Sequence, residues 1–369
     1  MNTIFIISSG VGLIKRGFET YAKELYSNLI NEGLNVYLIK GGGKSSKREK
    51  RIFCIPRYSM LNKFICKLIN APQKKYYIEF LSFSFFLTPY LLIKKPKIIY
   101  ALESPIYKYL LFIKKKFNLQ YKLIHFSGGQ IVNQIPDKDT ILHHVTPCFI
   151  EKAINIGFNP KKQILIPHFL TLPYKPNFLT NDELEIFKKK MAIPANRKIL
   201  LSVGNIDSSV KRMDYIITEI EELKGEYYLI ILGQYSEETE YIYNLAKKKL
   251  GANNFMIKTV SRKEISHYYQ ASDIFVLASL MEGFGLVYIE ALENGLPVIA
   301  HDFDISRYVL KDLGIYLDLS KEGVLKNFLI NYKPDLTYEA KRKRFEFVYN
   351  NYSWDVLKSD YLKMFEINE

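Results

Sequence analysis

Hydrophobic and polar positions along the chain alternate in the blocks that are typical of parallel α/β proteins. An apolar run over residues 3–9 leads into a glycine-bearing loop, and from Gly17 the apolar residues recur at helical spacing until Gly33. A second apolar run follows at residues 34–39. Further buried strands are predicted at residues 98–102, 122–126 and 164–167. The order strand, loop, helix, strand predicts the opening unit of a parallel sheet.

A second series of the same kind begins near Lys198. Its strands are predicted at residues 199–204, 227–232, 255–258, 273–277 and 297–300, with helices at 214–223, 263–270 and 285–294. Two successive series of this kind predict an α/β protein with two doubly wound domains. The proline-containing stretch 166–182 is the expected linker. We therefore expect an N-terminal domain over 1–170, a C-terminal domain over 171–350, and a final helix in 351–369 with Ser353 as its N-cap.

Composition and charge narrow the class of protein. The chain has 369 residues and a net charge of +14. Because 48% of its residues are hydrophobic and only 24% are charged, the composition is that of a globular chain and excludes a disordered one. The charge is uneven, because residues 1–175 carry +18 and residues 176–369 carry −4. Three scattered cysteines without a CxxC pair predict neither a disulfide framework nor a structural zinc site. The asymmetry of charge predicts two domains with different surfaces and partners.

No membrane span or signal peptide is expected from the sequence. The longest apolar stretch, residues 81–93, contains Pro89 and is shorter than the ~20 residues that cross a bilayer. The N-terminus lacks the basic region and the small-residue cleavage site of a signal peptide. A cytoplasmic protein that is not integral to the membrane is the expectation.

The most informative segment is ASLMEGFGLVYIEALENGLPVIAHD, residues 278–302. A strand is followed by a loop with Gly283 and Gly285 and then by an amphipathic helix, whose first amides form a site for phosphate. Glu282 precedes the loop and Glu290 lies in the helix, so the two carboxylates can face different parts of one ligand. The alternative is a plain helix N-terminus with two solvated glutamates.

EGFGLVYIE (282–290) resembles the E-x7-E motif of retaining GT-B glycosyltransferases of the family 4 type, which is also called glycosyl transferases group 1. GLPVIAHD is similar to the strand that follows it in that family, and LLSVGNIDSSVKRMDYII (200–217) resembles the segment that supplies cations to the donor diphosphate. Lys211 matches the lysine of that segment, and Gly204 the glycine before it. Asn205 stands where the family commonly has arginine, so one expected cation is missing; Arg212 is the candidate to compensate for it.

The resemblance reaches into the first half of the chain. SSGVGLIKRGFE is similar to the family's glycine-rich loop, with Gly17 matching the glycine whose amide approaches the donor phosphates and Arg16 replacing a second glycine. His125 in KLIHFSGGQ matches a histidine that contacts the transferred sugar, although a histidine at a strand end is often structural. Trp354 and the final helix resemble a crossover that returns to the N-terminal domain. Residues 45–120 resemble the family only loosely. A dinucleotide fingerprint fails because Lys15 stands where glycine is needed.

The resemblance implies a GT-B fold, in which two Rossmann-like domains face each other across a cleft. It also implies a retaining, metal-independent glycosyltransferase of hexosyltransferase type that uses a nucleotide diphosphate sugar and no cofactor. Glu282, His125 and Lys211 would be its catalytic residues. The donor would be bound by Gly17, Gly204, Lys211, Glu282, Gly283, Phe284, Gly285, Leu286 and Glu290. The pairs Asp137/Asp139 and Asp302/Asp304 resemble metal-binding DxD motifs but are not expected to bind metal. The alternatives are a GT-B phosphorylase or synthase, and a catalytically silent nucleotide-sugar-binding partner of another transferase.

The partners expected are the nucleotide-sugar donor and a lipid-linked or saccharide acceptor, in bacterial-type polysaccharide or glycolipid assembly. Lysines alternate with aromatic residues at 63–68, 74–77 and 108–117. Such faces suit an anionic membrane surface, which would place the protein peripherally on the inner face of the membrane. A solvated surface and an acidic soluble acceptor are the alternatives. No nucleic-acid-binding module is recognised, so nucleic acid is not an expected partner.

Overall fold

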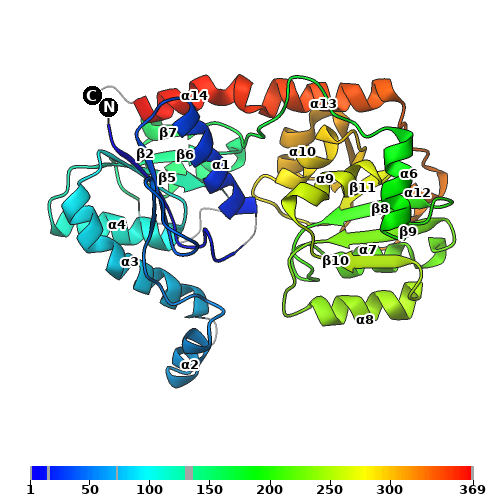
Figure 1. The fold of residues 1–369 in the computed structure, drawn as a ribbon, viewed down its shortest axis with the longest axis horizontal. Coiled ribbons are helices and arrows are strands. Elements are labelled where there is room, and N and C mark those ends of the chain that lie inside the picture. Colours follow the sequence, from blue (N-terminus) through cyan, green and yellow to red (C-terminus); the bar gives the residue numbers. More distant parts are fainter. Residues whose placement is uncertain (1, 15–16, 72–73, 129–135, 367–369) are drawn as a thin grey trace. The chain divides into compact units, whose positions relative to one another are not determined.

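The computed structural model describes residues 2–14, 17–71, 74–128 and 136–366. The chain forms two compact units, which Figure 1 shows as two α/β bodies. Unit 1 comprises Met1–His168 and Leu357–Glu369, and unit 2 comprises Phe169–Val356. The boundaries expected from the sequence, 170/171 and 350/351, lie two and six residues away from those of the two units.

Unit 1 is built on a seven-stranded sheet in which all the paired strands are parallel. Its order is β3-β2-β1-β4-β5-β6-β7. The strands are β1 (Ile4–Ser8), β2 (Val36–Lys40), β3 (Glu49–Arg51), β4 (Ile98–Ala101), β5 (Lys122–Ser127), β6 (Ile141–His144) and β7 (Gln163–Leu165). The predicted strands are present within one or two residues at their ends, whereas β3 and β6 were not predicted. β3 is the short sequence EKR, which carries no hydrophobic pattern.

The helices of unit 1 include the crossovers between these parallel strands and the C-terminal helix. They are α1 (Gly17–Asn31), α2 (Met60–Leu68), α3 (Lys75–Lys94), α4 (Ser104–Lys116), α5 (Ile150–Asn155) and most of α14 (Trp354–Glu366). Phe80, Phe83, Leu87 and Leu91 of α3 pack in the same core as Phe5 of β1. The apolar stretch 81–93 is therefore part of a 20-residue helix that is long and apolar enough to cross a membrane, but one side of it is core.

Unit 2 repeats the same architecture with six parallel strands in the order β10-β9-β8-β11-β12-β13. The strands are β8 (Lys198–Val203), β9 (Tyr227–Leu232), β10 (Phe255–Lys258), β11 (Ile274–Leu277), β12 (Val298–His301) and β13 (Gly314–Leu317). The helices are α6 (Asn181–Lys190), α7 (Met213–Glu219), α8 (Thr239–Leu250), α9 (Arg262–Gln270), α10 (Leu286–Glu293), α11 (Asp304–Leu310), α12 (Val324–Asn331) and α13 (Tyr338–Tyr352). The expectation of two doubly wound α/β domains is confirmed.

Each sheet has one point at which its strand order reverses. In unit 1 the chain runs outward from β1 through β2 to β3, then returns to β4 on the other side of β1. In unit 2 it does the same from β8 through β10 and back to β11. The loops that follow the two central strands diverge at such a point, and ligands of open α/β sheets bind in the resulting crevice. The loops after β8 and β11, and after β1 and β4, are therefore the places to look for a site.

Candidate active site

In the loop after β8, hydrogen bonds from backbone amides to the side chain of Asp207 position Lys211. Asp207 is buried and its Oδ1 accepts hydrogen bonds from the amides of Val210 (3.0 Å) and Lys211 (2.7 Å). The Lys211 side chain then passes over Gly204, the residue after β8, so closely that a Cβ on Gly204 would lie 3.0–3.1 Å from its stem. Glycine at 204 therefore leaves the space through which the lysine reaches the carboxyl ends of the strands.

Lys211 meets Glu282 at the reversal point of unit 2. The Lys211 Nζ donates to Glu282 Oε1 at 2.5 Å, so the loop after β8 is joined to the loop after β11. The two side chains are only 17% and 11% exposed, which strengthens their interaction relative to a surface pair. The structure thus brings together two residues that lie far apart in the chain and that the sequence analysis had assigned to one site.

The glycine loop after β11 leads directly into α10. Gly285 precedes the helix with φ +83°, a conformation that glycine adopts without strain, and a Cβ there would meet the Tyr288 ring at 2.4 Å. Phe284 is buried and packs edge-on against Tyr352, which anchors the loop. Gly283 and Leu286 are partly exposed on either side of this anchor. The first amides of α10 lie at the positive end of the helix dipole, where an anion is stabilised.

Glu290 lies farther along α10 and faces a different neighbour from Glu282. Its Oε2 accepts from the Tyr269 hydroxyl at 3.2 Å, and its Oε1 lies 3.7 Å from Arg262 Nη1. Burial, and then the negative charge of Glu290, raise the pKa of Tyr269 well above its usual value, so the hydroxyl stays a donor. The two glutamates of the motif are therefore held by different neighbours.

Several polar atoms near the carboxyl ends of these strands are buried without a hydrogen-bond partner among the residues described. They are Gln234 Oε1 after β9, Ser279 Oγ after β11, Tyr288 Oη on α10 and His301 Nδ1 at the end of β12. A buried polar atom that makes no hydrogen bond costs about 1–3 kcal/mol, so each of these atoms needs an explanation; His301 Nδ1 does lie 4.0 Å from Asp318 Oδ1. A polar ligand at this edge of the sheet would supply partners.

Arg212 has a structural role in this arrangement. Its Nη1 donates to the carbonyl of Leu319 (2.5 Å), and its guanidinium lies 4.5 Å from the centre of the Tyr215 ring. These contacts direct the cation into the body of unit 2. Asn205, at the position where a cation was expected, is exposed.

The two predicted residues of unit 1 lie in different surroundings. Gly17 is the first residue of α1 and is exposed, whereas Arg16 lies outside the described residues. His125, on β5, is completely buried: its ring stacks on Tyr107 at 4.3 Å and its Nδ1 lies 3.1 Å from the Ala101 carbonyl. Burial lowers the pKa of His125 to about 4, so the ring is neutral at pH 7. A sugar can touch this ring only after its neighbours move.

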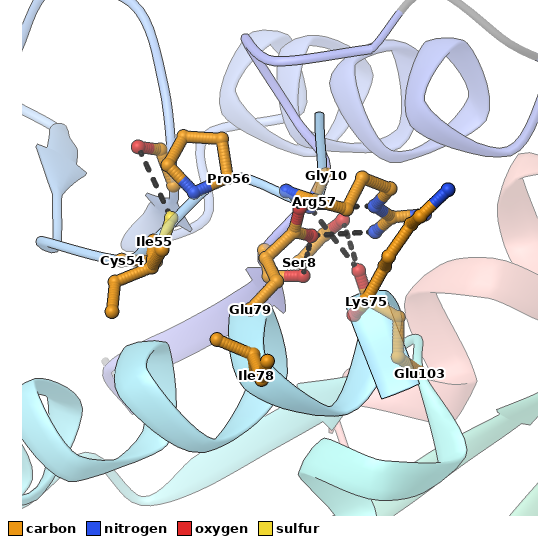
Figure 2. A network of polar contacts seen from close by, with 12 residues as sticks. Ser8, Gly10, Cys54, Ile55, Pro56, Arg57, Lys75, Ile78, Glu79 and Glu103 are labelled. Carbon is orange, nitrogen blue, oxygen red and sulfur yellow. Dashed lines mark hydrogen bonds and ion pairs between the residues drawn. The ribbon is translucent and has the colours of Figure 1, made fainter. Parts of the chain in front are cut away.

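A polar network that the sequence analysis missed lies at the reversal point of unit 1 (Figure 2). Ser8, the last residue of β1, donates through Oγ to Glu103 Oε1 at 2.8 Å, and Glu103 follows β4. Ser9 Oγ donates to Glu79 Oε1 at 3.0 Å. Glu79 of α3 in turn binds the Arg57 guanidinium through two hydrogen bonds, Nε to Oε2 (2.9 Å) and Nη2 to Oε1 (2.5 Å). Both side chains of that pair are at least 97% buried.

This network borders a pocket of about 390 Å³ that lies wholly within unit 1. The pocket is lined by Phe18, Arg57, Tyr76, Phe80 and Glu103. Burial raises the pKa of Glu103 to about 7, against hydrogen bonds from Ser8 and the Gly10 amide that lower it. The position of Glu103 directly after a strand at the reversal point was the signal that could have found it. Arg57 and Glu79 gave no such signal, because their pairing depends on how α3 packs.

No group of three or more His, Cys, Asp or Glu side chains is arranged to hold a metal ion within the described ranges. Asp302 is instead paired with Arg307 through two hydrogen bonds of 2.5 and 2.7 Å, and Asp137 accepts from Thr140 at 2.8 Å. The expectation of metal-independent chemistry without a cofactor stays a prediction.

Comparison with known sequences finds similarity to glycosyltransferases. Residues 184–318 match the family described as glycosyl transferases group 1. An uncharacterized glycosyltransferase of Haemophilus influenzae is 35% identical over 138 residues, which are 34% of this chain and 38% of that protein. An alpha-monoglucosyldiacylglycerol synthase of Acholeplasma laidlawii is 24% identical over 213 residues, 57% of this chain and 54% of that protein. The chain thus spans about half or less of these relatives.

Comparison with solved structures establishes the fold over nearly the whole chain. Sucrose-phosphate synthase from Thermosynechococcus elongatus matches with a TM-score of 0.80 at 16% identity, over 99% of this chain and 98% of that one. Anabaena HepE in complex with UDP-glucose matches with a TM-score of 0.78 at 12% identity, over 99% and 100%. The α/β two-domain fold is therefore that of the GT-B glycosyltransferases, as expected.

Proposed function

We propose that this protein is a retaining glycosyltransferase of the family 4, hexosyltransferase type, which transfers a sugar from a nucleotide diphosphate sugar to a hydroxyl acceptor without a metal ion. The observation that carries this proposal is the Lys211–Glu282 ion pair at the reversal point of unit 2, beside the N-terminus of α10. It puts a cation, a carboxylate and helix amides at one edge of the sheet. A diphosphate and a sugar hydroxyl are the groups that such a set recognises.

The roles proposed for the residues follow from their chemistry. Lys211, with the amides at the start of α10, neutralises the diphosphate as negative charge develops on it. Glu282, with the loop from Gly283 to Leu286, accepts hydrogen bonds from sugar hydroxyls, and Glu290 accepts them from the ribose. Gly17 would contribute its amide to the phosphates.

The bond changes balance without an enzyme nucleophile. The bond between the anomeric carbon and the β-phosphate oxygen breaks, and a bond from that carbon to the acceptor oxygen forms on the same face. The acceptor proton passes to the departing phosphate oxygen, and the nucleoside diphosphate leaves. His125, which is neutral and buried, would support the sugar side of the site.

UDP-glucose is the donor to test first, because HepE, which shares this fold, was solved in complex with it. A lipid-linked or saccharide acceptor is supported by the similarity to an alpha-monoglucosyldiacylglycerol synthase, in line with glycolipid or polysaccharide assembly at the cytoplasmic side of a membrane.

A peripheral membrane location is supported by what we call the α2–α3 apolar surface. It consists of exposed residues of α2 and α3: Met60, Leu61, Phe64, Leu68, Tyr76, Tyr77, Leu81, Phe85, Phe86 and Ile93. Of the nine residues of α2 only Asn62 and Cys66 are buried, while Met60 is 88% exposed and Leu68 75%. The exposed Lys63 and Lys67 lie on the same helix. An amphipathic helix with apolar residues and lysines suits an anionic bilayer surface.

The experiment that tests the transferase is the variant Glu282→Gln. It removes the carboxylate that is proposed to orient the sugar while keeping the shape of the side chain. We expect transfer or hydrolysis of the donor to fall about a hundredfold or more, with UDP still bound, because the loss is in the reacting state and not in nucleotide recognition. Donor turnover and UDP binding are measured on the same preparation.

Glu240→Gln, on the exposed start of α8, is the matched control and should behave as the unchanged protein. Unchanged turnover in Glu282→Gln would remove Glu282 from the mechanism. If the unchanged protein neither binds nor consumes any nucleotide sugar in a donor screen, the proposed function itself is wrong. Sugar release that depends on inorganic phosphate would instead indicate a phosphorylase.

A further inference from the structure

The pocket of unit 1 presents a hydrogen-bond acceptor that the protein leaves unused. Glu103 Oε2 is buried and has no hydrogen-bond partner among the residues that the structure describes, while Oε1 is fixed by Ser8. Glu103 is one of the five residues that line the pocket. A carboxyl oxygen that is held in place beside a pocket is suited to accept a hydrogen bond from a ligand hydroxyl.

The walls of the same pocket are aromatic. Phe18 of α1 and Tyr76 and Phe80 of α3 line it together with the Arg57 guanidinium. The guanidinium lies 4.4 Å from the centre of the Tyr76 ring and 5.6 Å from that of Phe80, so the aromatic wall is held by the cation that it covers. Aromatic faces pack against the C–H surface of a polyol, while a few polar atoms fix its orientation.

The charge of the pocket favours a neutral ligand over an anionic one. The positive charge of Arg57 is offset by Glu79, which takes two hydrogen bonds from the guanidinium and a third from the Arg57 amide at 2.9 Å. With that cation committed, Glu103 Oε2 remains a buried polar atom of the lining that has no hydrogen-bond partner among the described residues. A phosphate would stand beside a carboxyl group without a free guanidinium to neutralise it.

From this geometry we propose that the pocket binds a neutral polyol, namely a saccharide or glycerol moiety. Glu103 Oε2 accepts a hydrogen bond from one of its hydroxyls. The polyol is the headgroup of the acceptor, an assignment that rests on the proposed function. Burial keeps the Glu103 carboxyl close to half-protonated at neutral pH, which limits the cost of holding it beside a neutral ligand.

The position of the pocket adds a second point about the acceptor. Tyr76 belongs both to the pocket lining and to the α2–α3 apolar surface, and it is 43% exposed. A polyol in the pocket that carries an acyl or prenyl chain could therefore extend the chain over that surface. A free saccharide would use the pocket alone.

Saturation-transfer NMR on the full chain tests the proposal with four probes: methyl α-glucoside, glycerol, micellar dioctanoylglycerol and inorganic phosphate. We expect at least one neutral polyol to bind, and its dissociation constant to rise about tenfold in Glu103→Gln, since a hydrogen bond to a charged or part-charged group is lost. Tyr76→Ala should weaken the binding of the same probe, because it removes an exposed wall of the pocket and leaves the buried network in place. Preference for dioctanoylglycerol identifies a lipid source, and preference for methyl α-glucoside a saccharide.

The controls separate this inference from the proposed function. Glu282→Gln should bind the polyol as the unchanged protein does, and Glu103→Gln should retain UDP binding, which also shows that it is folded. The inference would be overturned if the unchanged protein binds no polyol, or if Glu103→Gln and Tyr76→Ala bind it as tightly as the unchanged protein does, even if UDP-sugar is consumed. Phosphate binding in preference to all neutral probes would overturn the ligand class.

Discussion

At the scale of single residues, the two candidate sites differ in the charge of their polar side chains. Lys211 and Glu282 are of opposite charge and in contact, so Lys211 can exchange the carboxylate for a donor phosphate while Glu282 turns to sugar hydroxyls. Within the described part of the chain, the buried Oε2 of Glu103 has no hydrogen-bond partner, and the pKa of Glu103 is raised to about 7. The first arrangement suits a charged donor, and the second a neutral ligand.

The raised pKa of Glu103 predicts a pH-dependent stability. The folded protein retains this proton up to about pH 7, while the unfolded chain loses it near pH 4.5, so the carboxyl destabilises the fold increasingly as pH rises through that window. Glu103→Gln should therefore unfold at about the same temperature as the unchanged protein at pH 5 and be more stable at pH 8, by up to about 3 kcal/mol. Thermal unfolding at both pH values measures this.

The groups around Glu103 account for the upward direction of its pKa shift. Ser8 of β1 and the Gly10 amide lower the pKa, Glu19 of α1 raises it, and Arg57 is committed to Glu79 of α3. Desolvation outweighs the two hydrogen bonds. A stability difference between the two proteins that does not change with pH would show that Glu103 is not titrating in this window.

At the scale of elements, some helices and loops could be predicted from local sequence, whereas others depend on tertiary packing. The loop and helix from Glu282 to Glu290 were predictable, because glycines, a preceding strand and amphipathic spacing are all local signals. α3 was not: its apolar residues surround most of the helix, so no periodicity indicated which side is core. Glu79 is completely buried on it because Arg57 pairs with it, which no pattern in 75–94 reveals.

The α2–α3 apolar surface predicts binding to anionic vesicles. The double variant Phe64→Ser/Leu68→Ser removes two large exposed side chains from α2, and we expect the vesicle-bound fraction to fall severalfold. Co-sedimentation with phosphatidylglycerol vesicles at low salt measures it, against phosphatidylcholine vesicles as the uncharged reference.

Ile186→Ser is the matched control, because Ile186 on α6 of unit 2 is 68% exposed, as Phe64 is 64%. Only the α2 variant should lose binding. If the unchanged protein does not sediment with anionic vesicles, or both variants lose binding equally, the proposed membrane surface is wrong.

At the scale of the whole molecule, the C-terminus is integrated into unit 1 by buried hydroxyls. The Tyr361 hydroxyl of α14 donates to the Pro167 carbonyl at 2.9 Å and lies 3.2 Å from the hydroxyl of Tyr21. Tyr21 meets Tyr100, whose hydroxyl is 2.7 Å from His143 Nδ1. Burial lowers the pKa of His143 to about 4, and its Nε2 faces the Ile166 carbonyl, so Nδ1 is the acceptor for Tyr100.

Tyr361→Phe should destabilise unit 1 by about 1–2 kcal/mol, because the Pro167 carbonyl loses its donor in a buried site. Tyr349→Phe is the control, since its hydroxyl bonds to Asp355 at the surface and should change stability by less than about 0.5 kcal/mol. Urea unfolding monitors both. Equal effects of the two variants would mean that the buried hydroxyl chain does not anchor the C-terminal helix.

The sequence by itself determined the alternation of strands and helices, the two doubly wound domains and the Glu282–Glu290 segment, because these depend on spacing within short stretches. Only the tertiary structure decided that Lys211 contacts Glu282, that His125 is buried against Tyr107, and that Arg57, Glu79 and Glu103 meet at the end of β1. Those contacts join residues that are remote in the chain. Strand order and helix packing bring them together, and no local pattern encodes either.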